Sequence, residues 1–328
     1  MNEGKRCDDA KCLYYTDSLT HQKKFSFVTA KTREGEGLWE KCNHCGLVIN
    51  RNGVPIDEIK EFYNSTYIAN NSYSEGELLS ARDHFNERLS TVQSIADFLD
   101  TWLDKTKTVF ELGAATGELL YLLKDKANYC FGNEINQLYT SFIRNELAIE
   151  ASSDDYLELE FRKKFDCVIA INTLDHLHNP IQTVEKIFGD LCDGGLFYIE
   201  VPNDNQALRV YLEEPYRTMF EEFMYQRAHY YSFNSKTIGE LLSQTGFTIL
   251  EEFSKHDYTL FNYLQWYFTG QSQKMLRTAM NDTSIHGGQS GFESDMNELF
   301  ADLNRKFKET IERWRVGELI CILARKPF

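Results

Sequence analysis

The feature that most constrains the fold is an alternation of strand-like and helix-like segments between residues 108 and 253. Apolar runs rich in β-branched and aromatic residues predict strands at 108–112, 129–134, 147–151, 165–171 and 196–201. Helical patterns lie between them at 117–126, 136–146 and 180–192, the last closed by Gly194-Gly195. A helix at 235–245, a strand at 247–253 and a final strand at 319–323 follow. Alternating strands and helices predict an α/β protein with a parallel sheet.

The rest of the chain divides around this core. Residues 1–75 predict a small lobe of short strands and turns, 76–256 the core, and 257–328 a helical insertion with the final strand. A helical pattern at 76–104 opens the core. Segments 203–234 and 256–316 interrupt the alternation, are rich in aromatic residues, and follow strand ends where α/β sheets bind ligands. We expect them to form a substrate lid.

Charge and hydropathy exclude several classes of partner. The net charge of −15 opposes a polyanionic substrate, so we expect no nucleic acid. The first residues lack the apolar core of a signal peptide, and no apolar run has the roughly 20 residues of a membrane span. We therefore expect a cytoplasmic protein.

The stretch from Val109 to Gly117 predicts a strand, a glycine loop and a helix start. Gly113 and Gly117 allow a ligand to lie against the main chain. A Walker loop is excluded because Glu118 follows Gly117, and a dinucleotide fingerprint lacks its second glycine because Ala115 stands there. The loop therefore favours a nucleoside without a phosphate. Glu134, at the end of the next strand, is placed to accept hydrogen bonds from both ribose hydroxyls.

Three motifs resemble those of class I S-adenosylmethionine (SAM)-dependent methyltransferases over about residues 40–256. They are Glu111-x-Gly113-x-x-x-Gly117, the fourth-strand segment 165–180, and the strand from Gly194-Gly195 to Pro202-Asn203. The resemblance implies a Rossmann-like seven-stranded sheet whose last strand is antiparallel. It also implies that SAM is bound by residues that follow four of the strands: Glu111, Gly113, Ala115, Gly117, Glu134, Asp154, Asp155, Asn172 and Thr173. Asp154 and Asp155 are alternative partners of the adenine amino group, and Asn172 and Thr173 would lie near the methionine part.

Four cysteines near the N-terminus have spacing typical of a metal site. Cys42 and Cys45 are separated by two residues and followed by Gly46, which lets two thiolates face one tetrahedral ion. Cys7 and Cys12 supply a second pair, which predicts one structural zinc. Two alternatives stay open: thiols without metal, or His44 or His21 in place of Cys7 or Cys12. A redox role is disfavoured because no thioredoxin-like βαβ unit surrounds the pair.

The context of Cys42 and Cys45 carries a finer resemblance. Trp39 to Ile49, followed by Glu61-Phe62-Tyr63 and Tyr67, is similar to the zinc-ribbon lobe of methyltransferases from sugar and surface-polysaccharide pathways, including deoxysugar C-methyltransferases. This resemblance implies a nucleotide-linked sugar or a glycan precursor as acceptor. The wide Cys7–Cys12 spacing departs from the family pattern.

Two histidines are candidate general bases, because a hydroxyl or carbon nucleophile must lose a proton. His176 follows the fourth strand, and His229 precedes the helix at 235–245. The alternative interpretation of each histidine is that it only shapes the pocket. Tyr63, Tyr67 and Tyr73 are candidate hydroxyl donors, or aromatic residues that only pack. The sugar C-methyltransferases have a Glu where this chain has Ala228, which weakens C-methylation.

The sequence thus predicts SAM-dependent methyl transfer to a hydroxylated small molecule, with O-methylation ahead of C- or N-methylation. A non-catalytic SAM-fold and zinc-ribbon scaffold and a methyltransferase for a non-sugar molecule are the alternatives. A nucleic-acid methyltransferase is opposed by the charge, and by Asn172-Thr173-Leu174-Asp175 where an Asp/Asn-Pro-Pro-aromatic tetrad would stand. The aromatic residues of the lid segments either stack on sugars or form a second core, and we expect core for most of them: Tyr211, Tyr216, Phe220, Tyr258, Phe261, Trp266 and Tyr267.

Overall fold

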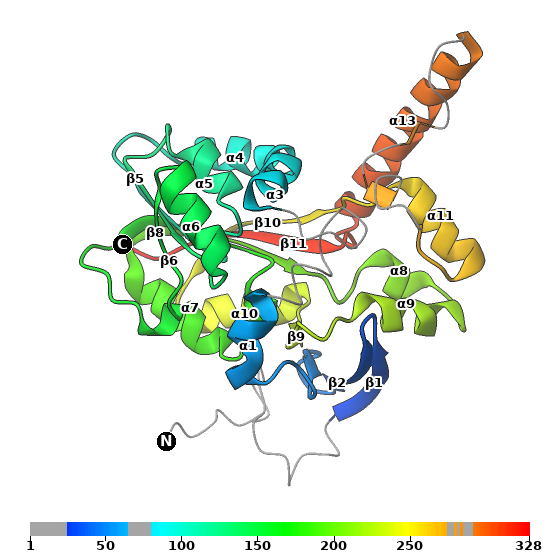
Figure 1. The fold of residues 1–328 in the computed structure, drawn as a ribbon. Helices are drawn as coiled ribbons and strands as arrows, with labels where there is room; N and C mark the ends of the chain where they lie inside the picture. The colour runs from blue at the N-terminus through cyan, green and yellow to red at the C-terminus, as the bar shows by residue number, and fades with distance from the viewer. Residues whose placement is uncertain (1–24, 65–79, 274–278, 281–282, 285–290) are drawn as a thin grey trace. The chain divides into compact units, whose positions relative to one another are not determined.

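The computed structural model describes residues 25–64, 80–273, 279–280, 283–284 and 291–328 (Figure 1). The chain forms two compact units. The first unit comprises Met1–Gly53, Val201–Ile238 and Glu252–Cys321. The second unit comprises Val54–Glu200, Gly239–Glu251 and Ile322–Phe328.

A seven-stranded sheet has the strand order β10-β11-β8-β7-β4-β5-β6. Its strands are β4 (Thr108–Leu112), β5 (Tyr129–Asn133), β6 (Glu150–Ser152), β7 (Phe165–Ile171), β8 (Leu191–Pro202), β10 (Thr248–Lys255) and β11 (Leu319–Arg325). The pairs β4–β5, β4–β7, β5–β6 and β7–β8 are parallel. The predicted α/β fold with a Rossmann-like, seven-stranded methyltransferase sheet is confirmed.

The last strand of the sheet runs against its neighbour. The Gly194 N–H donates to the Lys326 carbonyl and the Lys326 N–H donates to the Gly195 carbonyl, while Asn203 donates to Glu318 at the other end of β8. Residue numbers therefore rise along β8 as they fall along β11, which is an antiparallel register. This confirms the predicted antiparallel last strand.

Helices cover both faces of this sheet. Figure 1 shows α4 and α5 on one face and α7 on the other. The helical pattern predicted at 76–104 is a broken helix in its described part, with a 3₁₀ turn between α3 and α4. The helices and short 3₁₀ turns of the second unit are η2 (Ile56–Glu58), α1 (Ile59–Asn64), α3 (Ala81–Arg88), η3 (Leu89–Val92), α4 (Gln93–Asp100), α5 (Glu118–Leu123), α6 (Gln137–Glu146), η4 (Tyr156–Glu158), η5 (Leu174–His176) and α7 (Pro180–Asp190). The helix α10 (Ser235–Thr245) has the predicted bounds.

Two local predictions were wrong. The third strand lies at Glu150–Ser152 rather than at 147–151, because Leu147 caps α6 by donating its N–H to Phe142 and Ala148 has a left-handed backbone with φ +55°. Gly194-Gly195 does not close the preceding helix. That helix ends at Asp190, and both glycines lie in β8, where Gly194 bonds to β11.

The first unit contains a second, four-stranded sheet in the order β1-β2-β3-β9. Its strands are β1 (Phe25–Thr32), β2 (Gly35–Cys42), β3 (Val48–Asn50) and β9 (Tyr231–Ser232). All three pairings are antiparallel. The segment 203–234 thus contributes a strand to the N-terminal sheet.

Three helices of the first unit enclose a second hydrophobic core: α8 (Ala207–Tyr211), α9 (Tyr216–Met224) and α11 (Leu260–Thr269). The helix α13 (Gly291–Arg313) packs on α11. Phe220 and Trp266 are buried in this core with Leu208 and Leu212, and their rings meet edge to face with centroids 5.0 Å apart. These two aromatic residues are core, as expected. Tyr211 and Tyr267 differ, because they are 59% and 51% exposed.

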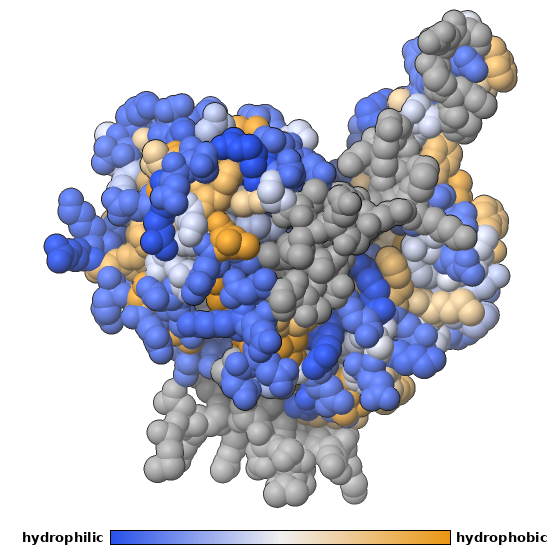
Figure 2. Space-filling view, in the orientation of Figure 1, coloured by the Kyte–Doolittle hydropathy of each residue, from blue (hydrophilic) through white to orange (hydrophobic). Residues whose placement is uncertain are grey.

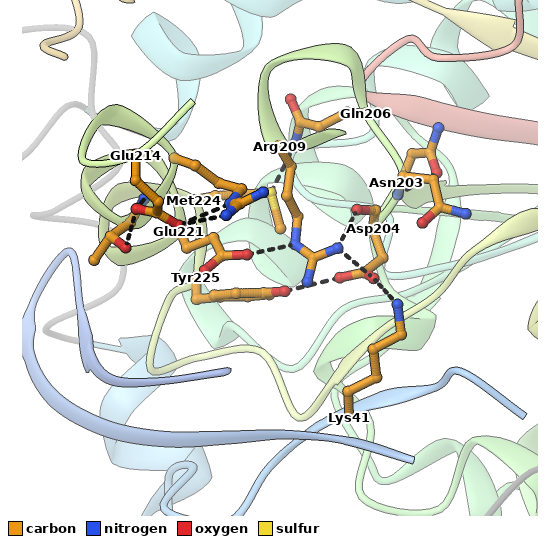
Figure 3. A network of polar contacts seen from close by, with 12 residues as sticks. Lys41, Asn203, Asp204, Gln206, Arg209, Glu214, Glu221, Met224 and Tyr225 are labelled. Atoms are coloured by element: carbon orange, nitrogen blue, oxygen red, sulfur yellow. Dashed lines mark hydrogen bonds and ion pairs between the residues drawn. The ribbon is translucent and has the colours of Figure 1, made fainter. Parts of the chain in front are cut away.

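A buried polar network holds the segment 203–234 to β2 inside the first unit (Figure 3). The Asp204 carboxylate accepts hydrogen bonds from Arg209 at 3.1 Å and from the Tyr225 hydroxyl at 2.8 Å. The Arg209 guanidinium also lies 3.2 Å from Glu221, and the Lys41 ammonium lies 4.0 Å from Asp204. Burial raises the pKa of Asp204, while Arg209, Tyr225 and Lys41 favour its ionised form. The network therefore stabilises the negative charge of the Asp204 carboxylate, which is buried away from water.

Candidate cofactor and active site

The glycine loop between β4 and α5 has an unusual backbone. Gly113, Ala115 and Gly117 have positive φ angles of 75°, 46° and 84°. The N–H groups of Gly113 and Ala114 donate to the Asn133 carbonyl, which ties the loop to the end of β5. A side chain at position 113 would collide with the hydroxyl of Thr173, at the end of β7. Glycine is therefore required both by the backbone angle and by close approach of the neighbouring strand end.

Glu134 points at this loop. Its carboxylate accepts hydrogen bonds from the Ala115 N–H at 2.9 Å and from the Asn136 N–H at 2.8 Å. Burial raises the pKa of Glu134 to about 7, although these two hydrogen bonds oppose the shift. Each carboxylate oxygen has further lone pairs, so the group remains able to accept from a ligand.

Three carboxylates converge on the loop. Glu111, in β4, and Glu118, in the first turn of α5, are both buried, and Glu134 lies between strand β5 and helix α6. The pKa of Glu111 is raised well above its usual value by burial, and then by Glu118 and Glu134. Its Oε2 atom has no hydrogen-bond partner among the described residues. A cationic ligand would relieve this repulsion, and SAM carries both a sulfonium and an ammonium group, so the donor set fits SAM.

His84, on α3, also belongs to this cluster, although the sequence analysis did not select it. Its Nδ1 atom lies 3.1 Å from the Thr116 hydroxyl and 3.3 Å from Glu118. The Thr116 hydroxyl in turn donates to Glu118 at 2.6 Å. The sequence signal was slight, because His84 is one of several polar residues of α3 and belongs to no distinctive motif.

The two acids after β6 have different surroundings. The Asp155 carboxylate caps η4 by accepting from the Leu157 N–H at 2.9 Å, whereas the Asp154 carboxylate accepts from the Ser152 hydroxyl at 2.7 Å. Asn133 fixes the Asp154 backbone by donating to its carbonyl at 3.0 Å. Both carboxylates are exposed.

The end of β7 lies beside the glycine loop. The Thr173 hydroxyl donates to the Leu112 carbonyl at 3.1 Å, which connects the ends of β7 and β4. Asn172 is exposed and has a φ of 46°, so the chain turns sharply here. The next residues form η5, in which the His176 N–H donates to the Thr173 carbonyl. His176 therefore lies one 3₁₀ turn after Thr173, the residue that contacts the end of β4.

The side chain of His176 has partners on both ring nitrogens. Nδ1 lies 2.7 Å from the Tyr63 hydroxyl, on α1, and Nε2 lies 3.6 Å from Oδ2 of Asp175. The Asp175 carboxylate is completely buried, and burial raises its pKa while His176 opposes the shift. A carboxylate beside Nε2 favours the tautomer protonated there, so that Nδ1 accepts from Tyr63.

The second histidine candidate lies in the first unit. His229 is half-buried between α9 and β9, and its backbone carbonyl accepts a hydrogen bond from the Asn50 side chain at 3.0 Å. Asn50 also lies within bonding distance of the Arg227 carbonyl. The backbone around His229 is therefore fixed to the end of β3.

The cysteine pair of the first unit lies at the turn between β2 and β3. Cys42 and Cys45 are buried, with 2% and 4% exposure, and the Gly46 N–H donates to the Cys42 carbonyl at 2.9 Å. Gly46 has a φ of 83°. Two buried sulfurs on one tight turn fit half of a tetrahedral thiolate site. Cys7 and Cys12 lie outside the described residues.

Residues 83–252 match a family model described as a methyltransferase domain. This match covers more than half of the 328 residues, and the chain belongs to that family. It is an enzyme of the SAM-dependent methyltransferase class, so the enzyme and SAM predictions are confirmed. Family membership favours the enzyme over the non-catalytic scaffold.

Several solved structures are similar to the chain, and no curated protein matches it. A chain from the complex of the Haloferax volcanii Trm112 methyltransferase activator with a methyltransferase is 16% identical, with 76% of this chain and 96% of that chain covered and a TM-score of 0.48. A SAM-dependent methyltransferase from Archaeoglobus fulgidus is 17% identical, with coverage of 73% and 94% and a TM-score of 0.45. The magnesium protoporphyrin IX methyltransferase from Synechocystis PCC 6803 is 17% identical, with coverage of 60% and 92% and a TM-score of 0.46.

The hydropathy of the surface and of the helices is relevant to the expected absence of a membrane span. On the face shown in Figure 2, the described residues are mostly hydrophilic, with scattered apolar side chains. Among the described residues, no helix is both long and apolar enough to cross a membrane.

Proposed function

We propose that this enzyme transfers the methyl group of SAM to a hydroxyl of a small molecule, with His176 as the general base that acts through the Tyr63 hydroxyl. The observation that carries the proposal is the hydrogen bond of 2.7 Å between the Tyr63 hydroxyl and Nδ1 of His176, next to the buried Asp175. SAM supplies a methyl group on a positively charged sulfur. The oxygen nucleophile attacks the methyl carbon in line, and the sulfur leaves as a neutral thioether.

The residues around the glycine loop bind the cofactor in this proposal. Glu134 accepts the ribose hydroxyls, and the left-handed backbone at Gly113, Ala115 and Gly117 lets the ligand lie against the main chain. Glu111 compensates the cationic part of SAM, and Asn172 and Thr173 adjoin the methionine part. For the adenine amino group we favour Asp154, because the Asp155 carboxylate already caps η4.

Tyr63 and Asp175 orient the base. Asp175 beside Nε2 holds the His176 proton on that nitrogen, so Nδ1 accepts the proton of the Tyr63 hydroxyl. Tyr63 in turn takes the proton that the acceptor hydroxyl loses. Such a relay keeps the acceptor oxygen nucleophilic without a permanent charge on Tyr63. His229 remains a second candidate base from the first unit.

The acceptor we propose is a nucleotide-linked sugar or a glycan precursor. This part rests on the similarity of Trp39–Ile49 and the Tyr63 segment to sugar-pathway methyltransferases, and on the net charge of −15, which opposes nucleic acid. Ala228 stands where the sugar C-methyltransferases that the sequence resembles have Glu, which favours transfer to oxygen over transfer to carbon.

We also propose a structural zinc bound by Cys42 and Cys45 together with Cys7 and Cys12. The two described sulfurs are buried at one tight turn of the N-terminal sheet. Zinc would lock the β2–β3 turn, since bound thiolates fix the backbone that carries them.

The experiment that tests the function is incubation of the full-length enzyme with methyl-labelled SAM and a panel of nucleotide sugars. We expect a labelled methyl ether on a sugar hydroxyl, located by mass spectrometry and NMR. Binding of SAM without transfer to any member of the panel would exclude the sugar acceptor and leave the reaction class. Absence of SAM binding by calorimetry would contradict the whole proposal.

A further inference from the structure

The helix α13 presents an apolar stripe that its own unit leaves exposed. Phe292, Leu299 and Leu303 are 71%, 49% and 41% exposed, and Ile311 is the one residue of this 23-residue helix that is buried. Phe292, Met296, Leu299 and Leu303 follow one another at intervals of four, three and four residues, so they lie on one face. Apolar residues are visible beside hydrophilic ones on this helix in Figure 2.

A different face of α13 packs within the first unit. The Phe300 ring lies 5.3 Å from Phe261, and the Phe307 ring lies 5.1 Å from Tyr263. The Asn304 side chain accepts a hydrogen bond from the Leu260 N–H at 2.7 Å. These contacts fix the helix on α11 through its C-terminal half, and Figure 1 shows the helix extending past α11. Among the described residues, the N-terminal stripe has no such packing in the first unit.

The charges of α13 are distributed unevenly along its axis. The first half, up to residue 304, contains four acids and no Lys or Arg: Glu293, Asp295, Glu298 and Asp302. The second half contains four bases and two acids: Arg305, Lys306, Lys308, Arg313, Glu309 and Glu312. Two copies side by side in parallel would place acid against acid. Two antiparallel copies would place the acidic half of each against the basic half of the other.

We propose that α13 pairs with α13 of a second copy of this chain in an antiparallel, two-fold symmetric dimer. The occupant of the exposed stripe is therefore the same stripe on the partner. An isologous interface of this kind requires a self-complementary surface, and the stripe and the charge distribution together supply one. Intervals of three and four residues are those of helices that pack along their length.

The spacing also fixes the register. If Leu303 lies on the two-fold axis, it packs against the partner's Leu303, and Phe292 reaches the partner's Trp314. Trp314 is 70% exposed and, with Tyr211 and Ile311, lines a pocket of about 280 Å³ at the C-terminal end of α13. The partner's Phe292 would enter this pocket. In the same register Asp295 lies beside the partner's Arg313, and both side chains are exposed.

The first test is the oligomeric state of the full-length protein, measured by sedimentation velocity over a range of concentrations. We expect a dimer for the wild type and for Ala301→Asp, an exposed position away from the stripe. We expect Leu299→Asp to raise the dimer Kd by more than about tenfold, because each dimer buries the new charge twice. SAM binding and Tm of Leu299→Asp should match those of the Ala301→Asp control, which shows that the variant folds.

A second test reads the orientation. Under oxidation, Leu303→Cys should form a disulfide with the partner's residue 303, identified by peptide mapping, whereas Phe292→Cys should not link to itself. Asp295→Arg should weaken the dimer, and the double variant Asp295→Arg/Arg313→Asp should restore it. A wild-type monomer at every concentration, an unchanged dimer in Leu299→Asp, or a 292–292 disulfide would each overturn the proposal.

Discussion

The phenolic oxygen of Tyr63 lies 2.7 Å from Nδ1 of His176, although 113 residues separate them in the chain. Asp175 lies on the other side of the imidazole, 3.6 Å from Nε2. This arrangement brings a tyrosine, a histidine and a buried carboxylate together at the end of β7. The proposed proton relay depends on it.

Replacement of Tyr63 by Phe tests the relay. We expect Tyr63→Phe to lower kcat by about 10²-fold or more, because a positioned proton acceptor contributes on that scale. The affinity for SAM, measured by calorimetry, should not change. Tyr129→Phe is the matched control. The Tyr129 hydroxyl, at the start of β5, donates to Glu150, whereas the glycine loop lies at the other end of that strand. Equal kcat values for Tyr63→Phe and the wild type would exclude Tyr63 from proton transfer.

The raised pKa of Glu134 predicts a pH dependence of SAM binding. Burial raises this pKa to about 7, and only the ionised carboxylate can accept hydrogen bonds from both ribose hydroxyls. The affinity should therefore be constant above pH 7 and fall as pH decreases below it, by about tenfold per pH unit. Glu134→Gln should bind more weakly by about 10- to 100-fold and lose this dependence. A persistent dependence in Glu134→Gln would show that another group is responsible, and Glu111, whose pKa burial also raises, is the candidate.

Gly113 provides a test of the loop geometry. Gly113→Ala should lower stability by about 1–3 kcal/mol and abolish SAM binding, because the methyl group meets the Thr173 hydroxyl and the backbone has a positive φ. Gly189→Ala is the control. Position 189 is in helix α7, and a Cβ atom added there would have no neighbouring atom within 4 Å. Alanine at 189 should therefore leave stability unchanged or raise it by about 0.5–1 kcal/mol. Thermal unfolding and calorimetry measure both effects.

Metal analysis tests the zinc site. The purified wild-type protein should contain one zinc per chain, and Cys42→Ser or Cys45→Ser should remove it and lower Tm, since metal binding and folding are coupled. Cys192→Ser, in strand β8, should keep the zinc. Equal zinc content in all four proteins, whether one or none, would exclude the proposed ligands.

The Asp204 network predicts a large loss of stability from one substitution (Figure 3). Asp204→Ala removes the carboxylate that accepts from Arg209 and Tyr225 and leaves the buried guanidinium with one of its two carboxylate partners, Glu221, which should cost about 3 kcal/mol. Glu214→Ala removes an exposed ion pair with Arg217 on the same helical segment and should leave the unfolding transition almost unchanged. A similar Tm for both variants would show that the buried network contributes little.

Local patterns explain which parts the sequence could predict. The strand and helix periods between 108 and 253, the loop with Gly113 and Gly117, and the acid at Glu134 are signals contained within a few residues of each other. A strand followed by a glycine loop and a helix has few possible arrangements, so the sheet and the cofactor loop could be expected before the structure. The errors at 147–151 and at Gly194-Gly195 are of the same local kind. Strand pairing determines the left-handed backbone of Ala148, just before β6, and the position of Gly194 inside β8.

Side-chain partners could not be predicted in the same way. The sequence selected His176 and Tyr63 separately, yet their hydrogen bond depends on the packing of α1 against the end of β7. His84 beside Glu118, β9 paired with β3, and Asp204 between Arg209 and Tyr225 join segments that are distant in sequence or have no distinctive pattern. Sequence periodicity determined the sheet and the glycine loop because backbone hydrogen bonding repeats at fixed intervals. Only the tertiary structure decided which polar side chains meet, because these side chains come from segments that packing brings together and that no local pattern connects.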